Sequence, residues 1–270
     1  MNGTHTVGIA GTGLIGASVG LRARELGWHV LGFDADPDVC ERARELGALD
    51  KCVSQEALYA SCDTVVLAMH TSGTLRELDR LRVEPPINTS LIIDVASVKA
   101  PVSAAGRGIP NFVATHPMAG AERSGPSAAR ATLFSDKPWL YVRPDDDALN
   151  ARAVHFLAAL GARPIAVEAA GHDARVALTS HVPQVLATLF AARVRESGGA
   201  NVDPYCGPTA RELMRLSRSS VAMWREILQE NNANVAAELR VLAKAMLDAA
   251  AALEQGDVSP IEAQLQIGRQ

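Results

Sequence analysis

The stretch that decides the fold is Val7-Gly-Ile-Ala-Gly-Thr-Gly-Leu-Ile-Gly16, close to the start of a chain of 270 residues. Its first four residues form a short apolar run of the strand type, and an amphipathic stretch follows over residues 14–26. The glycine spacing G-x-G-x-x-G is informative only when a strand precedes it and a helix follows it, and both patterns are present here. We therefore predict a strand, a tight turn and a helix whose amino terminus can bind phosphates.

The glycines of this turn and one later aspartate predict a dinucleotide site. Gly11 permits the tight turn, Gly13 lets a pyrophosphate approach the backbone, and Gly16 lets the helix pack on the strand. Asp34 ends the second predicted strand, 29–34, where its carboxylate can accept hydrogen bonds from the ribose of NAD and would repel the 2′-phosphate of NADP. The sequence therefore predicts NAD as the cofactor, with NADP disfavoured. The predicted cofactor-binding residues are Gly11, Gly13, Leu14, Ile15, Gly16 and Asp34.

Strand and helix patterns alternate from this turn up to Glu168. Apolar runs without alternation are typical of strands that are covered on both faces. The further predicted strands are 63–68, 91–95, 112–115, 139–142 and 164–168, with helices that include 37–46 and 148–160. Strands joined by helical crossovers predict an α/β Rossmann fold with a doubly wound, mostly parallel sheet.

After Glu168 the strand patterns stop and helical periodicity takes over. The predicted helices there are 172–196, 209–216 and 221–253. We therefore predict an NAD-binding Rossmann domain over residues 1–168, followed by an all-α domain for substrate binding and dimerisation over residues 169–270.

The last long helical segment carries more apolar surface than the helical half of the chain can cover by itself. Its apolar positions at helical spacing include Val235, Leu239, Leu242, Met246 and Leu253. An apolar stripe without a partner inside the domain favours association with a second copy. The sequence therefore predicts a homodimer formed through the helical domain.

Composition excludes several other classes of protein. A net charge of −4 gives no electrostatic reason for binding nucleic acid or an anionic membrane. The first residues do not resemble a signal peptide, and the longest uncharged run, 176–192, is too short and too polar to span a bilayer. The four cysteines show neither C-x-x-C pairs nor zinc spacing, so we predict no metal site and free thiols in a reducing cytoplasm.

Two polar clusters follow predicted strands, at the sheet edge where doubly wound folds bind their ligands. One runs over residues 94–99 and the other over residues 116–125. His116 precedes a proline, which favours an extended backbone and projects the imidazole from the end of the strand. A neutral histidine can take the proton of a hydroxyl group while a hydride leaves the same carbon. From placement alone, a structural histidine in a loop is an equal alternative.

Several motifs together resemble the prephenate/arogenate dehydrogenase family of tyrosine biosynthesis. They are Gly11-x-Gly-Leu-Ile-Gly16, Ser97-Val-Lys99, His116-Pro-Met-Ala-Gly120, Ser180-His-x-Pro183, and Arg215-Leu with Trp224 nine residues after the arginine. The resemblance extends over nearly the whole chain. It implies a Rossmann domain, a helical dimerisation domain, and NAD-dependent oxidative decarboxylation of prephenate or of its amino analogue, arogenate.

The resemblance also implies a role for each matching residue. His116 is similar to the base that takes the proton of the ring hydroxyl, and Ser97 to the serine that hydrogen-bonds both that hydroxyl and the histidine. Arg215 resembles the arginine that pairs with the ring carboxylate, as a bidentate guanidinium can. His181 and Trp224 are similar to residues that recognise the substrate side chain, and Glu122 to an acid that gates the entrance.

Other features of the helical half leave its substrate open. The family usually reads Phe-Arg-Asp-x-Thr-Arg where this chain has 210–215, and Gln184 stands where many prephenate enzymes carry a second histidine. Prephenate and arogenate therefore both remain candidates. Pro183 removes a backbone donor from its helix and predicts a kink that orients His181. His172, which precedes an aspartate, is interpreted as a helix-capping element.

Three rival functions are weighed against this one. An enzyme that acts on 4-amino-4-deoxyprephenate would show the same motifs. A β-hydroxyacid-type dehydrogenase needs a catalytic lysine on the first long helix after the sheet, and residues 172–192 contain none. A non-catalytic NAD sensor would not need the histidine and arginine that are present at 116 and 215.

Overall fold

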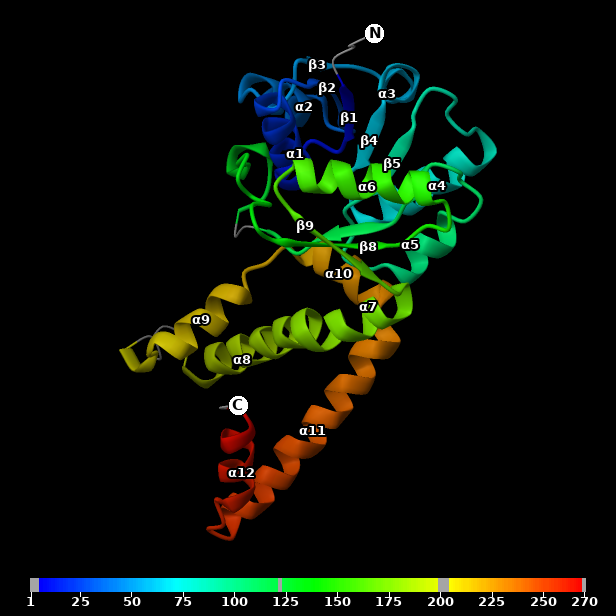
Figure 1. Ribbon diagram of the computed structural model, residues 1–270. Coiled ribbons are helices and arrows are strands. Elements are labelled where there is room, and N and C mark those ends of the chain that lie inside the picture. The colour runs from blue at the N-terminus through cyan, green and yellow to red at the C-terminus, as the bar shows by residue number, and fades with distance from the viewer. Residues whose placement is uncertain (1–4, 121–122, 199–203, 269–270) are drawn as a thin grey trace. The chain divides into compact units, whose positions relative to one another are not determined.

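A computed structural model describes residues 5–120, 123–198 and 204–268 (Figure 1). The chain forms two compact units. The first comprises the chain up to Asp173 together with Ser219–Glu230, and the second comprises Ala174–Arg218 and the chain from Asn231 onwards. This division differs from the predicted one in that residues 169–173 and 219–230 pack with the Rossmann part.

The first unit is built on a six-stranded parallel sheet with the order β3-β2-β1-β4-β5-β6. Its strands are β1 Thr6–Ala10, β2 His29–Phe33, β3 Lys51–Cys52, β4 Thr64–Leu67, β5 Leu91–Asp94 and β6 Phe112–Val113. The helices between them are α1 Leu14–Glu25, α2 Pro37–Glu45, α3 Gln55–Ser61, α4 Thr71–Val83 and α5 Ala100–Ala105. The strands β4 and β5 are buried at every residue, as their unbroken apolar runs predict. The doubly wound Rossmann fold is confirmed.

A second, three-stranded sheet completes this unit. It contains β7 Thr115–Pro117, β8 Pro138–Val142 and β9 Arg163–Val167, with the short 3-10 helix η1 Pro126–Ala128 and the helix α6 Asp147–Ala159. The strand β7 pairs with β8 in antiparallel fashion, and β8 pairs with β9 in parallel.

The prediction of one strand over 112–115 that ends before His116 is wrong. The backbone leaves the six-stranded sheet after Val113 and enters the second sheet at Thr115, so His116 lies inside β7, opposite Leu140. The cause is the side chain of Asp94, whose Oδ1 accepts the backbone N–H of Thr115 at 2.7 Å.

The remaining helices are α7 Ala169–Val176, α8 Val182–Gly198, α9 Pro208–Leu216, α10 Val221–Glu230, α11 Asn232–Glu254 and α12 Ser259–Ile267. A π-helical turn, Ala177–His181, joins α7 to α8 and ends two residues before Pro183. The missing N–H of proline accounts for an irregular turn here, at the place where the sequence predicts a kink. The single helix predicted over 221–253 is wrong, because the chain breaks at Asn231 and α10 belongs to the first unit.

In the part of the chain that the structure describes, no helix is both long enough and apolar enough to cross a membrane.

Candidate active site

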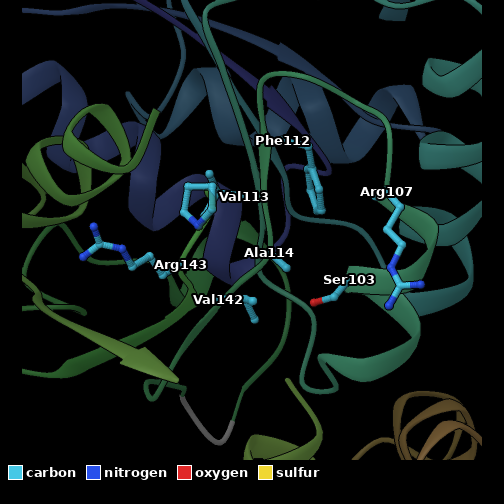
Figure 2. A pocket seen from close by; sticks show the side chains of 9 residues that line it. Ser103, Arg107, Phe112, Val113, Ala114, Val142 and Arg143 are labelled. Atoms are coloured by element: carbon cyan, nitrogen blue, oxygen red, sulfur yellow. The ribbon is translucent and has the colours of Figure 1, made fainter. Parts of the chain in front are cut away.

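Of two hollows on the described surface, one contains a predicted site residue. The hollow in Figure 2 has a volume of about 120 Å³ and is lined by residues of α5, β6 and β8, which include Ser103, Phe112 and Val142. Its Arg143 donates to Asp147, and no predicted site residue lines it. The other hollow, of about 280 Å³, belongs to the second unit and includes Arg215.

The three glycines of the turn after β1 differ in what surrounds them. Gly11 has a φ of +96°, and a Cβ there would lie 2.5 Å from the carbonyl oxygen of Ala68. A Cβ on Gly16 would lie 2.0 Å from the carbonyl oxygen of Gly11. A Cβ on Gly13, by contrast, would meet nothing within 4 Å, and this residue is the N-cap of α1. The fold itself requires the outer two glycines, while the middle one leaves open space at a helix amino terminus, where a pyrophosphate fits.

Asp34 lies beside this turn and helps to hold it. Its carboxylate accepts hydrogen bonds from the backbone N–H of Thr12 at 2.7 Å, from the Thr12 hydroxyl at 3.1 Å and from the backbone N–H of Asp36 at 3.1 Å. The sequence predicts only a contact with ribose for this residue. The structural role of Thr12 was not predicted, because it depends on a contact across 22 positions of sequence.

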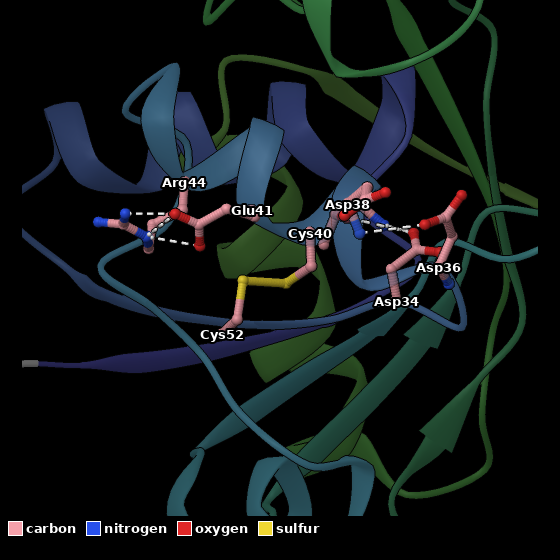
Figure 3. The surroundings of a disulfide bond; sticks show 8 residues. Asp34, Asp36, Asp38, Cys40, Glu41, Arg44 and Cys52 are labelled. Carbon is pink, nitrogen blue, oxygen red and sulfur yellow. Dashed lines mark hydrogen bonds and ion pairs between the residues drawn. A yellow bond between two sulfur atoms is a disulfide. The ribbon is translucent and has the colours of Figure 1, made fainter.

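A disulfide lies near Asp34 and corrects the prediction of four free thiols. Cys40 in α2 and Cys52 in β3 are bonded, with 6.2 Å between their Cα atoms, and Figure 3 shows them beside Asp34 and Asp36. Cys52 follows Cys40 by twelve positions, so the spacing resembles no short redox motif. Cys62 and Cys206 are buried and lie outside this disulfide.

His116 heads a hydrogen-bonded row of three side chains in the first unit. Its Nδ1 lies 2.9 Å from Nε2 of His172, and Nδ1 of His172 lies 2.7 Å from Oδ1 of Asp173. The same carboxylate accepts the backbone N–H groups of Lys99 at 2.7 Å and Ala100 at 2.8 Å, where α5 begins. The prediction of His172 as a helix-capping element is wrong, because Asp173 caps α5 while His172 bridges Asp173 and His116.

A buried ion pair fixes the connection between β5 and β7. The ammonium group of Lys99, which is fully buried, donates to the carboxylate of Asp94 and to the carbonyl oxygen of Thr115. Burial raises the pKa of Asp94, and the charge of Lys99 opposes that rise. Ser97 lies on the same connection, half-buried, at the sheet edge where β5 ends.

Trp224 lies on α10, which a carboxylate fastens to the first unit. Glu226 accepts the backbone N–H of Ser72 at 3.0 Å and its hydroxyl at 2.8 Å, in the first turn of α4. Partial burial would raise the pKa of Glu226, but the hydrogen bonds from Ser72 outweigh it and lower that pKa. The predicted recognition residue is therefore carried by the first unit.

His181 and Arg215 lie in the second unit. His181 is buried at the end of the π-helical turn, and its Nδ1 accepts from the amide of Asn231 at 3.1 Å. Arg215 forms a two-point ion pair with Glu212 and lines its hollow with Arg211, Met214 and Arg218.

Two further residues of the sequence analysis concern the substrate. Gln184 donates to the carbonyl oxygen of Leu216 at 2.9 Å, which ties α8 to the end of α9. Glu122, the predicted gating acid, lies outside the described residues.

Comparison with known proteins places both halves of the chain in one family. The nucleotide-binding domain model of prephenate dehydrogenase matches residues 18–166, and its dimerization domain model matches residues 168–267. The chain is 33% identical to the probable prephenate dehydrogenase NovF of Streptomyces niveus, over 96% of this chain and 72% of that protein. It is 30% identical to a cyclohexadienyl dehydrogenase of Zymomonas mobilis, over 83% of this chain and 80% of that protein.

The fold agrees with these matches. A crystal structure of prephenate dehydrogenase from Aquifex aeolicus, in complex with hydroxyphenyl propionate and NAD+, superimposes with a TM-score of 0.87 at 22% identity. The match covers 99% of this chain and 98% of that one.

Proposed function

Because this chain belongs to the prephenate dehydrogenase family, we propose that it catalyses the NAD-dependent oxidative decarboxylation of prephenate or arogenate. The observation that carries the proposal is the row from His116 through His172 to Asp173, which starts at the β7 edge of the nucleotide-binding unit. A histidine supported in this way can act as a base towards a hydroxyl group.

The turn after β1 holds the cofactor. The open space at Gly13 and the amino terminus of α1 bind its pyrophosphate, and Leu14 and Ile15 are the first two residues of that helix. NAD+, when bound, is the hydride acceptor. Asp34 favours NAD over NADP, since its charge repels a 2′-phosphate. Replacing Asp34 with serine and adding an arginine beside it should shift the preference towards NADP, and faster turnover of the unaltered enzyme with NADP at equal concentration would contradict this role.

The protein's own residues handle the proton and the carboxylate. His116 takes the proton of the ring hydroxyl at Nε2, and Ser97 hydrogen-bonds that hydroxyl. Arg215 pairs with the ring carboxylate, which leaves as carbon dioxide while the electrons of its bond enter the aromatic ring. His181 and Trp224 recognise the side chain of the substrate, and Glu122 gates the entrance. The reacting system needs positioning and a base, because aromatisation drives the step.

The experiment that tests the proposal is turnover with prephenate and with arogenate, each with NAD and with NADP, followed by absorbance of the reduced cofactor and by the aromatic product. His116→Asn should reduce kcat by roughly 10²–10⁴, the usual scale of losing a general base, and should leave the Kd for NAD unchanged. Including 4-amino-4-deoxyprephenate tests the rival function whose motifs would look the same. No turnover of either substrate with either cofactor would refute the proposal.

The proposal includes two properties of the whole protein, a cytoplasmic location and a homodimer. The family model that covers residues 168–267 describes a dimerization domain, which supports the second. Cell fractionation tests the first, and the second is argued in the Discussion.

A further inference from the structure

We propose that His172 and Asp173 position His116 and fix which of its two nitrogens carries the proton, so that the imidazole is basic at Nε2. The inference rests on the proposed role of His116 as the base. Neither His172 nor Asp173 belongs to the motifs that reveal the family.

The hydrogen bonds determine the proton positions one after another. Asp173 accepts three hydrogen bonds, from His172, from the backbone N–H of Lys99 and from that of Ala100. A carboxylate with three donors is ionised and only accepts, so Nδ1 of His172 carries its proton. Burial alone would raise the pKa of Asp173, but these donors outweigh it and lower that pKa. The ionised state therefore holds at the pH of a cytoplasmic enzyme.

The position of the proton on His116 follows from that on His172. A neutral His172 that is protonated at Nδ1 has a lone pair at Nε2, which lies 2.9 Å from Nδ1 of His116. That contact is a hydrogen bond only if His116 donates from Nδ1. The neutral His116 then has its lone pair at Nε2, which is the atom that must accept the proton of a substrate hydroxyl.

The row also stabilises the product of proton transfer. When His116 becomes an imidazolium, its Nδ1–H donates a stronger, charge-assisted hydrogen bond to His172, and Asp173 lies behind His172 as a counter-charge. His172 and Asp173 are each 2% exposed, so water screens this interaction little. The hydrogen bond between His172 and His116 also constrains the direction of the His116 ring, whose plane is inclined by 68° to that of His172.

Lys99 and Asp94 form another pair of ionisable groups close to this row. The ammonium group of Lys99 donates to the carbonyl oxygen of Thr115, next to His116, and its charge also acts on Asp173. Its partner Asp94 carries the opposite charge and is equally buried. This pair therefore adds little net charge, and Asp173 is the carboxylate that ends the row from His116 through His172.

Three variants test the inference through kcat, KM and the pH profile of kcat/KM. His172→Leu removes the acceptor and should lower kcat by about 10–10²-fold, which is less than loss of the base, while KM changes less than threefold. Asp173→Asn removes the counter-charge and should move the acidic limb of the profile to lower pH by about 0.5–1 unit, because the imidazolium of His116 loses stabilisation. His172→Gln keeps an acceptor for Nδ1 of His116 and should recover part of the loss in kcat.

A matched control separates this effect from any histidine substitution. His155 is exposed on α6, and His155→Gln should leave kcat and the profile unchanged. Circular dichroism and thermal unfolding establish that each variant is folded. If folded His172→Leu retains kcat within threefold and keeps the pH midpoint, the inference is wrong even though the proposed reaction stands.

A second readout needs no substrate and so remains decisive if the proposed reaction fails. Nitrogen-15 NMR of histidine-labelled protein, assigned with the His116→Asn and His172→Gln variants, reports which ring nitrogen is protonated. We expect both His116 and His172 to carry the proton at Nδ1 when neutral, and the midpoint of His116 to fall in Asp173→Asn. Observation of His116 as the Nε2–H tautomer, or of an unchanged midpoint, overturns the inference.

Discussion

The glycines in the turn after β1 have different roles, one in binding the cofactor and two in stabilising the fold. All three glycines match one motif, yet only Gly13 has free space where a side chain would stand. Gly11 and Gly16 are required by close backbone contacts that exist without any ligand. Substitution should therefore separate binding of the cofactor from stability of the fold.

We predict opposite outcomes for alanine at two of these glycines. Gly13→Ala should weaken NAD binding by at least about tenfold, because the methyl group occupies the place of the pyrophosphate, while the free energy of unfolding changes by less than about 1 kcal/mol. Gly16→Ala should destabilise the fold by about 1–3 kcal/mol, the usual scale of overpacking. Calorimetric titration of NAD and urea denaturation measure the two effects. Equal destabilisation by both substitutions would show that the open space at Gly13 has another purpose.

Arg215 is the residue whose substitution best distinguishes this reaction from that of a generic dehydrogenase. Arg215→Ala should raise the KM for prephenate or arogenate by roughly 30-fold or more, since loss of one partner of a desolvated charge pair costs about 2–5 kcal/mol. The Kd for NAD should stay the same, because the proposed cofactor site is built from residues of the first unit.

Arg218→Ala is the matched control for Arg215, since Arg218 lines the same hollow but belongs to no family motif. It should change KM by less than about threefold. A normal KM in Arg215→Ala, or a joint loss of NAD and substrate affinity, would show that the carboxylate binds elsewhere.

Helices and strands are predictable from the sequence where the local pattern of apolar residues determines them. The strands β4 and β5 match their predicted ranges to within about one residue, because four buried apolar residues in a row fit no exposed structure. The strand β7 was not predictable, since it arises when the side chain of Asp94 takes the backbone N–H that would otherwise continue β6. The break at Asn231 has a weak local signal, since Asn231, Asn232 and Asn234 are poor helix formers, but neither glycine nor proline marks it and apolar residues at helical spacing continue on both sides.

In the candidate site, too, the sequence predicts what local pattern decides and not what depends on distant contacts. The motifs identified His116, Arg215 and the glycines, because their residue types and spacing are local signals. The support from His172 could not be found in the same way, since the two histidines are 56 positions apart and meet only in the folded chain. The only local signal was the adjacent pair His172-Asp173 shortly after β9, and this pair is explained equally well as a helix cap.

The connection between β5 and β7 should depend on the charge of Lys99. Lys99→Met leaves the carboxylate of Asp94 buried without a counter-charge, so we expect destabilisation of about 3–5 kcal/mol at neutral pH. Burial already raises the pKa of Asp94, and loss of Lys99 raises it further. A group with a raised pKa in the folded state stabilises the fold below its unfolded pKa, and this contribution is lost as pH rises through the folded value.

The destabilisation by Lys99→Met should therefore be smaller near pH 5 than near pH 8. Urea denaturation of the variant and of the unaltered protein at the two pH values measures the difference. The exposed Lys137→Met is the control and should change stability by less than about 0.5 kcal/mol at either pH. A pH-independent loss in Lys99→Met would mean that packing of the lysine stem, rather than its charge, supports the connection.

The two units of the protein differ in how well they bury their apolar side chains. Both large clusters of buried hydrophobic residues lie in the first unit. Along α11, Val235 is 4% exposed, but Met246 and Leu253 are 54% and 50% exposed. The exposed large apolar residues of the second unit include Leu189, Val241, Leu247, Leu265 and Ile267. An apolar surface this large in a helical unit is typical of an interface that another protein surface covers.

We predict that two copies of the chain cover this surface. Burial of each large aliphatic side chain contributes about 1.5–3 kcal/mol, so a face with several of them can outweigh the entropy lost on association. Light scattering at micromolar concentration should give twice the 28.5 kDa mass of one chain. Leu247→Asp on α11 should shift the population towards the monomer, because each dimer would then bury an unpaired charge at this face. Ile87→Asp, at a residue of the first unit that is 97% exposed, should leave the dimer intact. A mass of 28.5 kDa for the unaltered protein, or equal dissociation by both substitutions, would show that this face is not the interface.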